Sequence, residues 1–364
     1  MKFNFKILRN FDLPLFLIII ILTAMGILTI YSTTSAIYFY KDYYLKQLMW
    51  FFISLIIFVI ILFFDYEKIV RYTYLFYFLV IVLLIATLYF GKEIRGSKSW
   101  LVLDFIRIQP SELAKIFTIL TLAKYLSNRE SPPQKLYQII IPLIIVGLPA
   151  ILILKQPDLG TAVIFLPIFF VIIYIANVSK KIIIVLILIF ALAAISSYPF
   201  LSNYQKDRIK IFFNPSKDIL GKGYNLTQSK IAIGSGRIFG KGFKKGTQAT
   251  GRFLPEHHTD FIFASWAEQF GLVGSGALLL LYALLIIRTF QSALLAKDMF
   301  SRLSIIGLST LILAHIVVNI STITGLLPIS GLPLPFMSYG GSSLLAMYIS
   351  YGFIFNFITR RYMF

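Results

Sequence analysis

The long apolar stretches of this chain limit its fold more than any other feature. Of its 364 residues, 58% are hydrophobic and 13% are charged. A helix needs roughly 20 apolar residues to cross the hydrocarbon core of a bilayer. Ten such stretches lie near residues 12–31, 46–64, 70–90, 111–126, 136–154, 160–177, 180–200, 261–288, 301–323 and 340–358. The sequence therefore predicts an all-α polytopic membrane protein with about ten transmembrane helices, folded as a single domain over residues 1–364.

The basic residues of the short loops predict how these helices are oriented. Lys and Arg collect in short cytoplasmic loops, whereas long loops cross the membrane largely regardless of their charge. Such residues are more frequent on the side of the amino terminus, for example Lys68, Arg71 and Lys180. We therefore expect both termini in the cytoplasm and a large extracytoplasmic loop, about residues 201–260, between helices 7 and 8. Residues 224–233 of this loop mix polar and apolar side chains, which predicts a short interfacial helix.

The composition also excludes several classes of function. The chain has no cysteine, which excludes thiol catalysis, and its three histidines make a multi-histidine metal centre a poor interpretation. The glycine-rich residues 234–242 match neither nucleotide-binding fingerprint, so we expect no nucleotide or organic cofactor. The net charge of +19 suggests anionic lipids or phosphates as partners. Nucleic acid is disfavoured because the basic residues lie in loops between apolar stretches.

One polar stretch, from Arg252 to Ala264, stands where the long loop meets the eighth apolar stretch. Asp260 in this stretch is followed directly by Phe261, Ile262 and Phe263. An acid at that depth is costly to desolvate and usually has a function. A polar collar that marks the membrane edge is the alternative, but the apolar residues after Asp260 favour a chemical role.

The same stretch raises the question of a metal. Glu256, His257, His258 and Asp260 bring two carboxylates and two imidazoles together, but their spacing matches no closed zinc site. One interpretation is a divalent Mg or Mn ion, with Asp260 as a ligand, shared with substrate phosphates. The other is hydrogen bonding within the loop, which we favour for the two histidines.

Other polar residues allow a structural interpretation beside a functional one. Glu112 and Lys115 lie three residues apart near a helix start, and their spacing fits a structural ion pair as well as a substrate contact. Asp158 precedes an apolar stretch, where an aspartate is well suited to cap the helix. His315 and Asn319, four residues apart in the ninth stretch, predict an interhelical hydrogen bond.

Four ordered motifs spread over nearly the whole chain resemble the SEDS family (shape, elongation, division and sporulation). They are Gln109–Lys115, Gln156–Gly160, Gly331–Ser343 and the stretch Arg252–Ala264 with Gly246–Gln248 before it and Ala267–Glu268 after it. The resemblance implies that Gly331–Ser343, as irregular backbone at membrane depth, shapes a cavity. This family commonly has a second acid after the position of Glu268. The present chain has Gln269 there, so any role of that acid does not carry over.

The resemblance implies a peptidoglycan glycosyltransferase that polymerises lipid II into glycan strands during cell elongation. Asp260 would be the general base, and undecaprenyl pyrophosphate would be the leaving group. Basic loop residues or a divalent cation would stabilise the pyrophosphate. The substrate or cavity residues would be Glu112, Lys115, Asp158, Lys241, Arg252, His257 and His258.

The family also implies a location and a partner. The chain would be a multi-pass protein of the bacterial cytoplasmic (inner) membrane, among membrane lipids, with an extracytoplasmic active site. Its partner would be a class B penicillin-binding protein, the transpeptidase that crosslinks the strands. Two other functions stay open: a flippase or transporter for lipid II, and a non-catalytic scaffold of a cell-wall synthesis complex.

Overall fold

The structure is a computed structural model of the chain. It describes residues 9–35, 40–94, 97–103, 106–196, 198–200, 206–207, 211–212, 221–251 and 253–360. Arg252, which the sequence predicts as a substrate contact, lies outside these residues.

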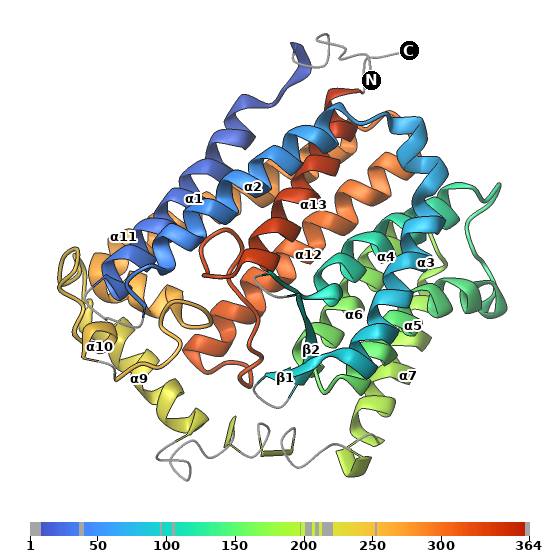
Figure 1. Cartoon of the computed structure of the whole chain (residues 1–364). Helices are drawn as coiled ribbons and strands as arrows, with labels where there is room; N and C mark the ends of the chain where they lie inside the picture. Colours follow the sequence, from blue (N-terminus) through green and yellow to red (C-terminus); the bar gives the residue numbers. More distant parts are fainter. Residues whose placement is uncertain are drawn as a thin grey trace.

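Helices make up most of the described chain (Figure 1). They are α1 (Leu13–Thr34), α2 (Tyr43–Phe63), α3 (Tyr66–Phe90), α4 (Pro110–Ser127), α5 (Ile140–Lys155), α6 (Leu159–Ile175), α7 (Lys180–Ser196), α9 (Lys222–Ser235), α10 (Thr247–Thr250), α11 (Ile262–Leu294), α12 (Met299–Thr324) and α13 (Gly341–Thr359), with 3-10 turns at Leu136–Ile139 and Tyr198–Phe200. A helix therefore occupies each of the ten predicted ranges, and α9 covers the short helix predicted at 224–233.

Several helices have the length and composition of membrane spans. In the described part of the chain, seven helices are long and apolar enough to cross a membrane: α1, α2, α3, α5 with the turn before it, α11, α12 and α13. The apolar helix α6 is shorter, with 17 residues. The chain is thus a mostly helical multi-pass membrane protein. That all ten helices cross the membrane stays a prediction.

Short polar side chains begin several of these helices. Asp12 accepts a hydrogen bond from the backbone of Leu15 at the start of α1, at 3.0 Å. Asp298 does the same for Ser301 at the start of α12, at 2.8 Å. At its other end α12 stops at Gly325, whose left-handed φ of 80° favours glycine. These caps fix where the long apolar runs begin and end.

The described residues also include a small antiparallel sheet, which the all-α prediction missed. It has the order β1 (Lys92–Ile94), β2 (Ser97–Leu103) and β3 (Ile106–Ile108). Strands β2 and β3 pair in register from Leu101 opposite Ile108 to Leu103 opposite Ile106. Strands β1 and β3 have three residues each, too few for a clear alternating pattern, and the seven residues of β2 do not alternate between polar and apolar. The sheet lies at the start of α4, where β2 contacts both α3 and α4 (Figure 1).

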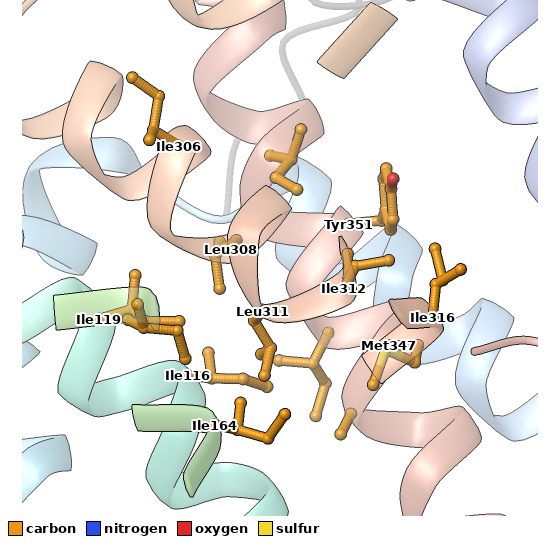
Figure 2. Close-up of a cluster of buried hydrophobic side chains, with 14 of the residues drawn as sticks. Ile116, Ile119, Ile164, Ile306, Leu308, Leu311, Ile312, Ile316, Met347 and Tyr351 are labelled. Atoms are coloured by element: carbon orange, nitrogen blue, oxygen red, sulfur yellow. The ribbon is translucent and has the colours of Figure 1, made fainter. Parts of the chain in front are cut away.

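The core is built around α12, which contacts α4, α6, α11 and α13. Figure 2 shows part of it, where side chains of α12 such as Leu311 and Ile312 meet Ile116 of α4, Ile164 of α6 and Met347 of α13. The outer helices α2 and α3 instead leave many apolar side chains exposed, as surfaces that face lipid do. Helix α12 is therefore the central helix of the core, and the polar segment around Asp260 packs against it.

Helix α11 is interrupted near its start, at Gly271, where φ is 65° and ψ is −159°. A regular helix would pair the amide of Leu272 with the carbonyl of Glu268. Instead the amides of Leu272 and Val273 donate to the carbonyls of Arg237 and Ile238, at 2.8 and 3.1 Å. In exchange, the carbonyls of Glu268 and Gln269 each accept an amide from residues 241–242, both at 3.0 Å. The second half of the long loop is thus fixed to α11 by its backbone.

Candidate functional site

The site is centred on Asp260, which lies two residues before α11 begins at Ile262. The carboxylate is partly exposed, whereas the three residues after it are buried. Its Oδ2 atom lies beside Gly331, where an added Cβ would come within 3.7 Å of it. Gly331 has a φ of 72°, so the position favours glycine on conformational grounds as well. The predicted catalytic acid therefore stands at the edge of the bundle, reachable from outside and next to backbone.

The loop between α12 and α13, residues 325–340, packs directly against the Asp260 segment. The hydroxyl of Ser338 donates to the carbonyl of Thr259 at 2.8 Å, and the amide of Tyr339 donates to the carbonyl of His258 at 2.8 Å. Gln47 of α2 holds the same loop from the other side: its Nε2 donates to Ser338 O at 3.1 Å. Two segments about 80 residues apart in sequence are thus joined at the candidate base. Gln47 is a site residue that the sequence analysis missed, whereas Ser338 belongs to the Gly331–Ser343 motif that it assigned to the cavity.

Glu112 and Lys115 form an ion pair inside the bundle. The ammonium of Lys115 lies 2.8 Å from Oε1 of Glu112, and the two side chains are 0% and 3% exposed. The same ammonium lies 2.8 Å from Nε2 of His315 on α12. The sequence allowed a structural pair or a substrate contact, and the structure shows a buried pair whose charge faces protein groups. The predicted interhelical hydrogen bond of His315 is confirmed.

Asp158 caps α6, as its position before an apolar stretch suggested. Its carboxylate accepts bonds from the amide and the hydroxyl of Thr161, at 3.1 and 2.8 Å. The turn that carries Asp158 also touches the α12–α13 loop, because a Cβ added at Gly160 would lie 2.5 Å from the carbonyl oxygen of Ser330. Asp158 thus acts in shaping the neighbourhood of the site, and a direct substrate contact stays a prediction.

His257 and His258 are buried in a cluster of aromatic rings. His258 lies 5.2 Å from the ring of Tyr40, 5.1 Å from that of Tyr43 and 5.7 Å from that of Tyr339. Tyr43 and Tyr339 stack on each other at 4.4 Å. These surroundings hold the histidines within protein.

The hydrogen bonding of His257 agrees with this burial. Its Nδ1 atom donates to the carbonyl of Leu254 at 3.1 Å, so its proton sits on that nitrogen. Burial lowers the pKa of His257 below its ordinary value. Across the part of the chain that the structure describes, no group of three or more His, Cys, Asp or Glu side chains could hold a metal ion. The bond to Leu254 confirms the loop hydrogen bonding favoured for this histidine, and a divalent ion shared with substrate phosphates stays a prediction.

Lys241 is paired with Glu268, a residue for which the sequence suggests packing or a partner contact. Its ammonium lies 2.7 Å from Oε1 of Glu268, and the carboxylate is 1% exposed. Glu268 also accepts the backbone amides of Thr247 and Gln248, at 2.8 and 3.2 Å. The carboxylate thus gathers the loop around the first turns of α11. Its position among apolar residues was the available signal, because a buried acid must be paired.

The geometry can now be set beside known proteins. A family model for cell cycle proteins, FtsW/RodA/SpoVE, matches residues 13–362. The chain belongs to this family.

Relatives in the FtsW/RodA/SpoVE family carry descriptive names. Peptidoglycan glycosyltransferase MrdB of Escherichia coli K12 is 40% identical over 288 residues, which is 79% of this chain and 78% of that protein. Peptidoglycan glycosyltransferase RodA of Treponema pallidum is 33% identical over 426 aligned positions, covering 97% of this chain and 98% of that protein.

Solved structures of FtsW/RodA/SpoVE proteins share the fold. One chain of a peptidoglycan synthase complex matches with a TM-score of 0.84 and 29% identity, over 97% of this chain and 99% of that one. RodA of Thermus thermophilus matches with a TM-score of 0.74 and 27% identity, over 97% and 98%. Two of the motifs by which the sequence resembled this family, Gly331–Ser343 and the stretch around Asp260, are in direct contact in the structure.

Proposed function

We propose that the chain is a peptidoglycan glycosyltransferase that polymerises lipid II during cell elongation, with Asp260 as its general base. Its relatives MrdB and RodA are named peptidoglycan glycosyltransferases, which supports the activity. The observation that carries the assignment of the base is the convergence of separate motifs on one partly exposed carboxylate. Glycan transfer needs such a group, because the attacking hydroxyl must lose a proton.

The proposed reaction exchanges one carbon–oxygen bond for another and moves one proton. The acceptor hydroxyl oxygen attacks the anomeric carbon of the donor, and its proton passes to the carboxylate of Asp260. The bond between that carbon and the pyrophosphate oxygen breaks, and undecaprenyl pyrophosphate leaves with the electron pair. Gly331, which has no side chain, leaves space beside Oδ2 for the approaching hydroxyl.

Cations of the long loop would stabilise the leaving pyrophosphate. Lys241 is one, with a side chain that is 28% exposed while paired to Glu268. Arg252 stays a second, predicted contact. A divalent Mg or Mn ion shared with substrate phosphates stays a prediction too. The described residues include no group of three or more His, Cys, Asp or Glu side chains that could hold it.

The site would face the outside of the cytoplasmic membrane, with ten crossings and both termini in the cytoplasm. The amide of Asn10 donates to the carbonyl of Thr359 at 3.3 Å, so α1 begins where α13 ends. An even number of membrane crossings would place both termini on the same side of the membrane. Helices α9 and α10 of the long loop lie at the opposite end of α1 and α11 (Figure 1).

A second protein would work with the chain. One structural relative is part of a peptidoglycan synthase complex that coordinates polymerization and crosslinking. We infer a class B penicillin-binding protein as partner, and expect glycan synthesis to rise when it is added, by a shift toward the competent arrangement. Equal turnover at matched enzyme and lipid, with and without partner, would argue against this coupling.

The test of the base is Asp260→Asn, assayed for glycan product from lipid II in detergent. Loss of a general base typically costs a factor of ~10²–10⁴, about 3–5 kcal/mol of barrier. The matched control is Asp42→Asn, an exposed aspartate that caps no helix with its side chain and should leave synthesis unchanged. Near-parent synthesis by Asp260→Asn would overturn the assignment. Absence of product from the parent protein with its partner would favour the transporter, since detergent offers no second leaflet.

A further inference from the structure

We propose that Asn319 and His315 of α12 are positioning residues that hold Asp260 against the α12–α13 loop. On this proposal the buried Glu112–Lys115 pair acts through His315 and does not touch the substrate. The inference rests on the proposed function, because it assigns roles around the same carboxylate.

Asn319 joins the two segments of the site with one amide group. Its Nδ2 donates to the backbone carbonyl of Asp260 at 3.0 Å and to that of Leu332 at 2.7 Å. The side chain is 2% exposed, so no solvent competes for these bonds. Leu332 follows Gly331, the residue that lies beside the carboxylate of Asp260. One side chain thus sets the distance between the base and the backbone that faces it.

His315 makes the same kind of contact one turn earlier on α12. Residues four apart lie on one face of a helix, so His315 and Asn319 both face the loop. The Nδ1 atom of His315 lies 3.4 Å from the carbonyl of Pro333, which can only accept. Its Nε2 atom lies 2.8 Å from the ammonium of Lys115, which can only donate. The two contacts together require a neutral imidazole with its proton on Nδ1.

The ion pair completes the support from the far side of the ring. Lys115 is fully buried, and its ammonium lies within hydrogen-bond distance of Glu112 and His315. Because the side chain is 0% exposed, a substrate phosphate could reach the ammonium only if the bundle opened around it. Glu112 holds Lys115, Lys115 orients the imidazole, and the imidazole holds Pro333. This order explains how a charge inside the bundle affects chemistry at its edge.

The need for such support follows from the backbone it holds. Carbonyls in irregular segments at membrane depth have no helical partner and are satisfied by side chains or cavity groups. Leu332, Pro333 and Asp260 offer three such carbonyls, all directed at one face of α12. Without donors on α12 the loop and the base would separate, and a displacement of about 1 Å can cost up to ~10²-fold in rate.

The main experiment replaces Asn319 by leucine, which has a similar size and no donor. In the detergent assay with partner, Asn319→Leu should lower kcat about 10- to 100-fold and change KM for lipid II less than about twofold. The control is Thr310→Val on the same helix, a buried hydroxyl that bonds only within α12, at 2.8 Å to Ile306. It should keep the parent kcat. If Asn319→Leu does not fold, Asn319→Ala, which cannot overfill the site, takes its place with the same expectation.

A second readout does not depend on activity. Amide hydrogen exchange of residues 331–339 should be faster in Asn319→Leu than in the parent, and unchanged in Thr310→Val. Parent-like exchange in Asn319→Leu, or a parent-like kcat, would overturn the proposal. If instead Asp260→Asn keeps its synthesis, the assigned base fails, and the exchange result still decides whether Asn319 holds the loop.

A cycle tests the path through His315. His315→Asn keeps a donor for Pro333 but has no acceptor at the position of Nε2, where Lys115 donates. Glu112→Gln with Lys115→Met removes the pair without leaving a charge. Combined, they should lower kcat no more than the more damaging change alone, within about twofold. Losses that multiply would mean that Lys115 acts on substrate directly, which contradicts the proposal.

Discussion

Two ion pairs among the described residues, one inside the bundle and one at the long loop, are built in opposite ways. The buried pair joins Glu112 and Lys115, three residues apart on α4, at 0–3% exposure and against His315 of the central helix. The loop pair joins Lys241 and Glu268, 27 residues apart, with the lysine 28% exposed. The first sits under the α12–α13 loop and the second closes the long loop onto α11. One pair therefore lies within the bundle beneath the α12–α13 loop, and the other fastens the long loop to the first turns of α11.

The difference shows where each charge gains its stability. In the buried pair both charges are desolvated, so each depends on the other, and removal of one is more harmful than removal of both. In the loop pair only the carboxylate is desolvated, and backbone amides share it with Lys241. Glu268 should therefore matter more than its lysine, while Glu112 and Lys115 should matter together.

The largest expected effect comes from breaking the buried pair. Glu112→Ala should lower the free energy of unfolding by about 3–5 kcal/mol, because Lys115 keeps a charge without its counterion. Adding Lys115→Ala should recover most of this stability without recovering glycan synthesis, since His315 then lacks its partner. Thermal unfolding in detergent measures the stability, and the amount of glycan product measures the synthesis. Losses that simply add in both readouts would mean that the residues do not interact.

A smaller effect is expected when the loop pair loses its carboxylate. Glu268→Gln keeps the size of the side chain but removes the charge that accepts Lys241 and two backbone amides. Hydrogen bonds to charged groups are worth about 1.5–3 kcal/mol, so we expect a loss of about 2 kcal/mol, with faster hydrogen exchange at Thr247 and Gln248. Unchanged exchange at these amides would show that the carboxylate does not hold the loop.

Removing the lysine of the loop pair should cost less again. Lys241→Met should lower stability by about 0.5–1 kcal/mol, because its ammonium is partly solvated. The difference between this variant and the parent should shrink at high salt, whereas the effect of Glu112→Ala should not. A salt-independent loss as large as that of Glu268→Gln would contradict the contrast between the two pairs.

The smallest effect concerns a single proton on His257, beside the site. Burial lowers the pKa of His257, so its imidazole stays neutral in the folded protein at a pH where it already binds a proton in the unfolded chain. Stability should therefore be complete above the ordinary histidine pKa, about 6.5, and fall as the pH drops below it. His257→Asn, which keeps a donor for Leu254, should flatten this slope in pH-dependent unfolding. A parent-like slope in the variant would assign the proton to another group.

Local chemistry was predictable from sequence, and long-range chemistry was not. The ranges of the membrane helices, the cap by Asp158 and the pairing of Glu112 with Lys115 all depend on neighbours within one or two turns. The partners of Glu268 lie about 20 residues away, and Asn319 reaches Asp260 across 59. The position of Asn319 in an apolar stretch predicts a buried amide, but only the packing of α12 shows which carbonyls accept its hydrogen bonds. The sheet was missed because β1 and β3 have only three residues each and the seven residues of β2 do not alternate between polar and apolar.

The break in α11 bears on how the chain assembles. Two amides at Leu272 and Val273 take their partners from residues 237–238, which the ribosome delivers earlier and which, in the proposed topology, lie outside the membrane. A Cβ on Gly240 would overlap the carbonyl of Gln269, so the joint closes only around bare backbone. Insertion of α11 and docking of the loop are then one event. Substitutions at Gly240 or Gly271 should therefore lower the yield of inserted protein more than they lower the turnover of the protein that does insert.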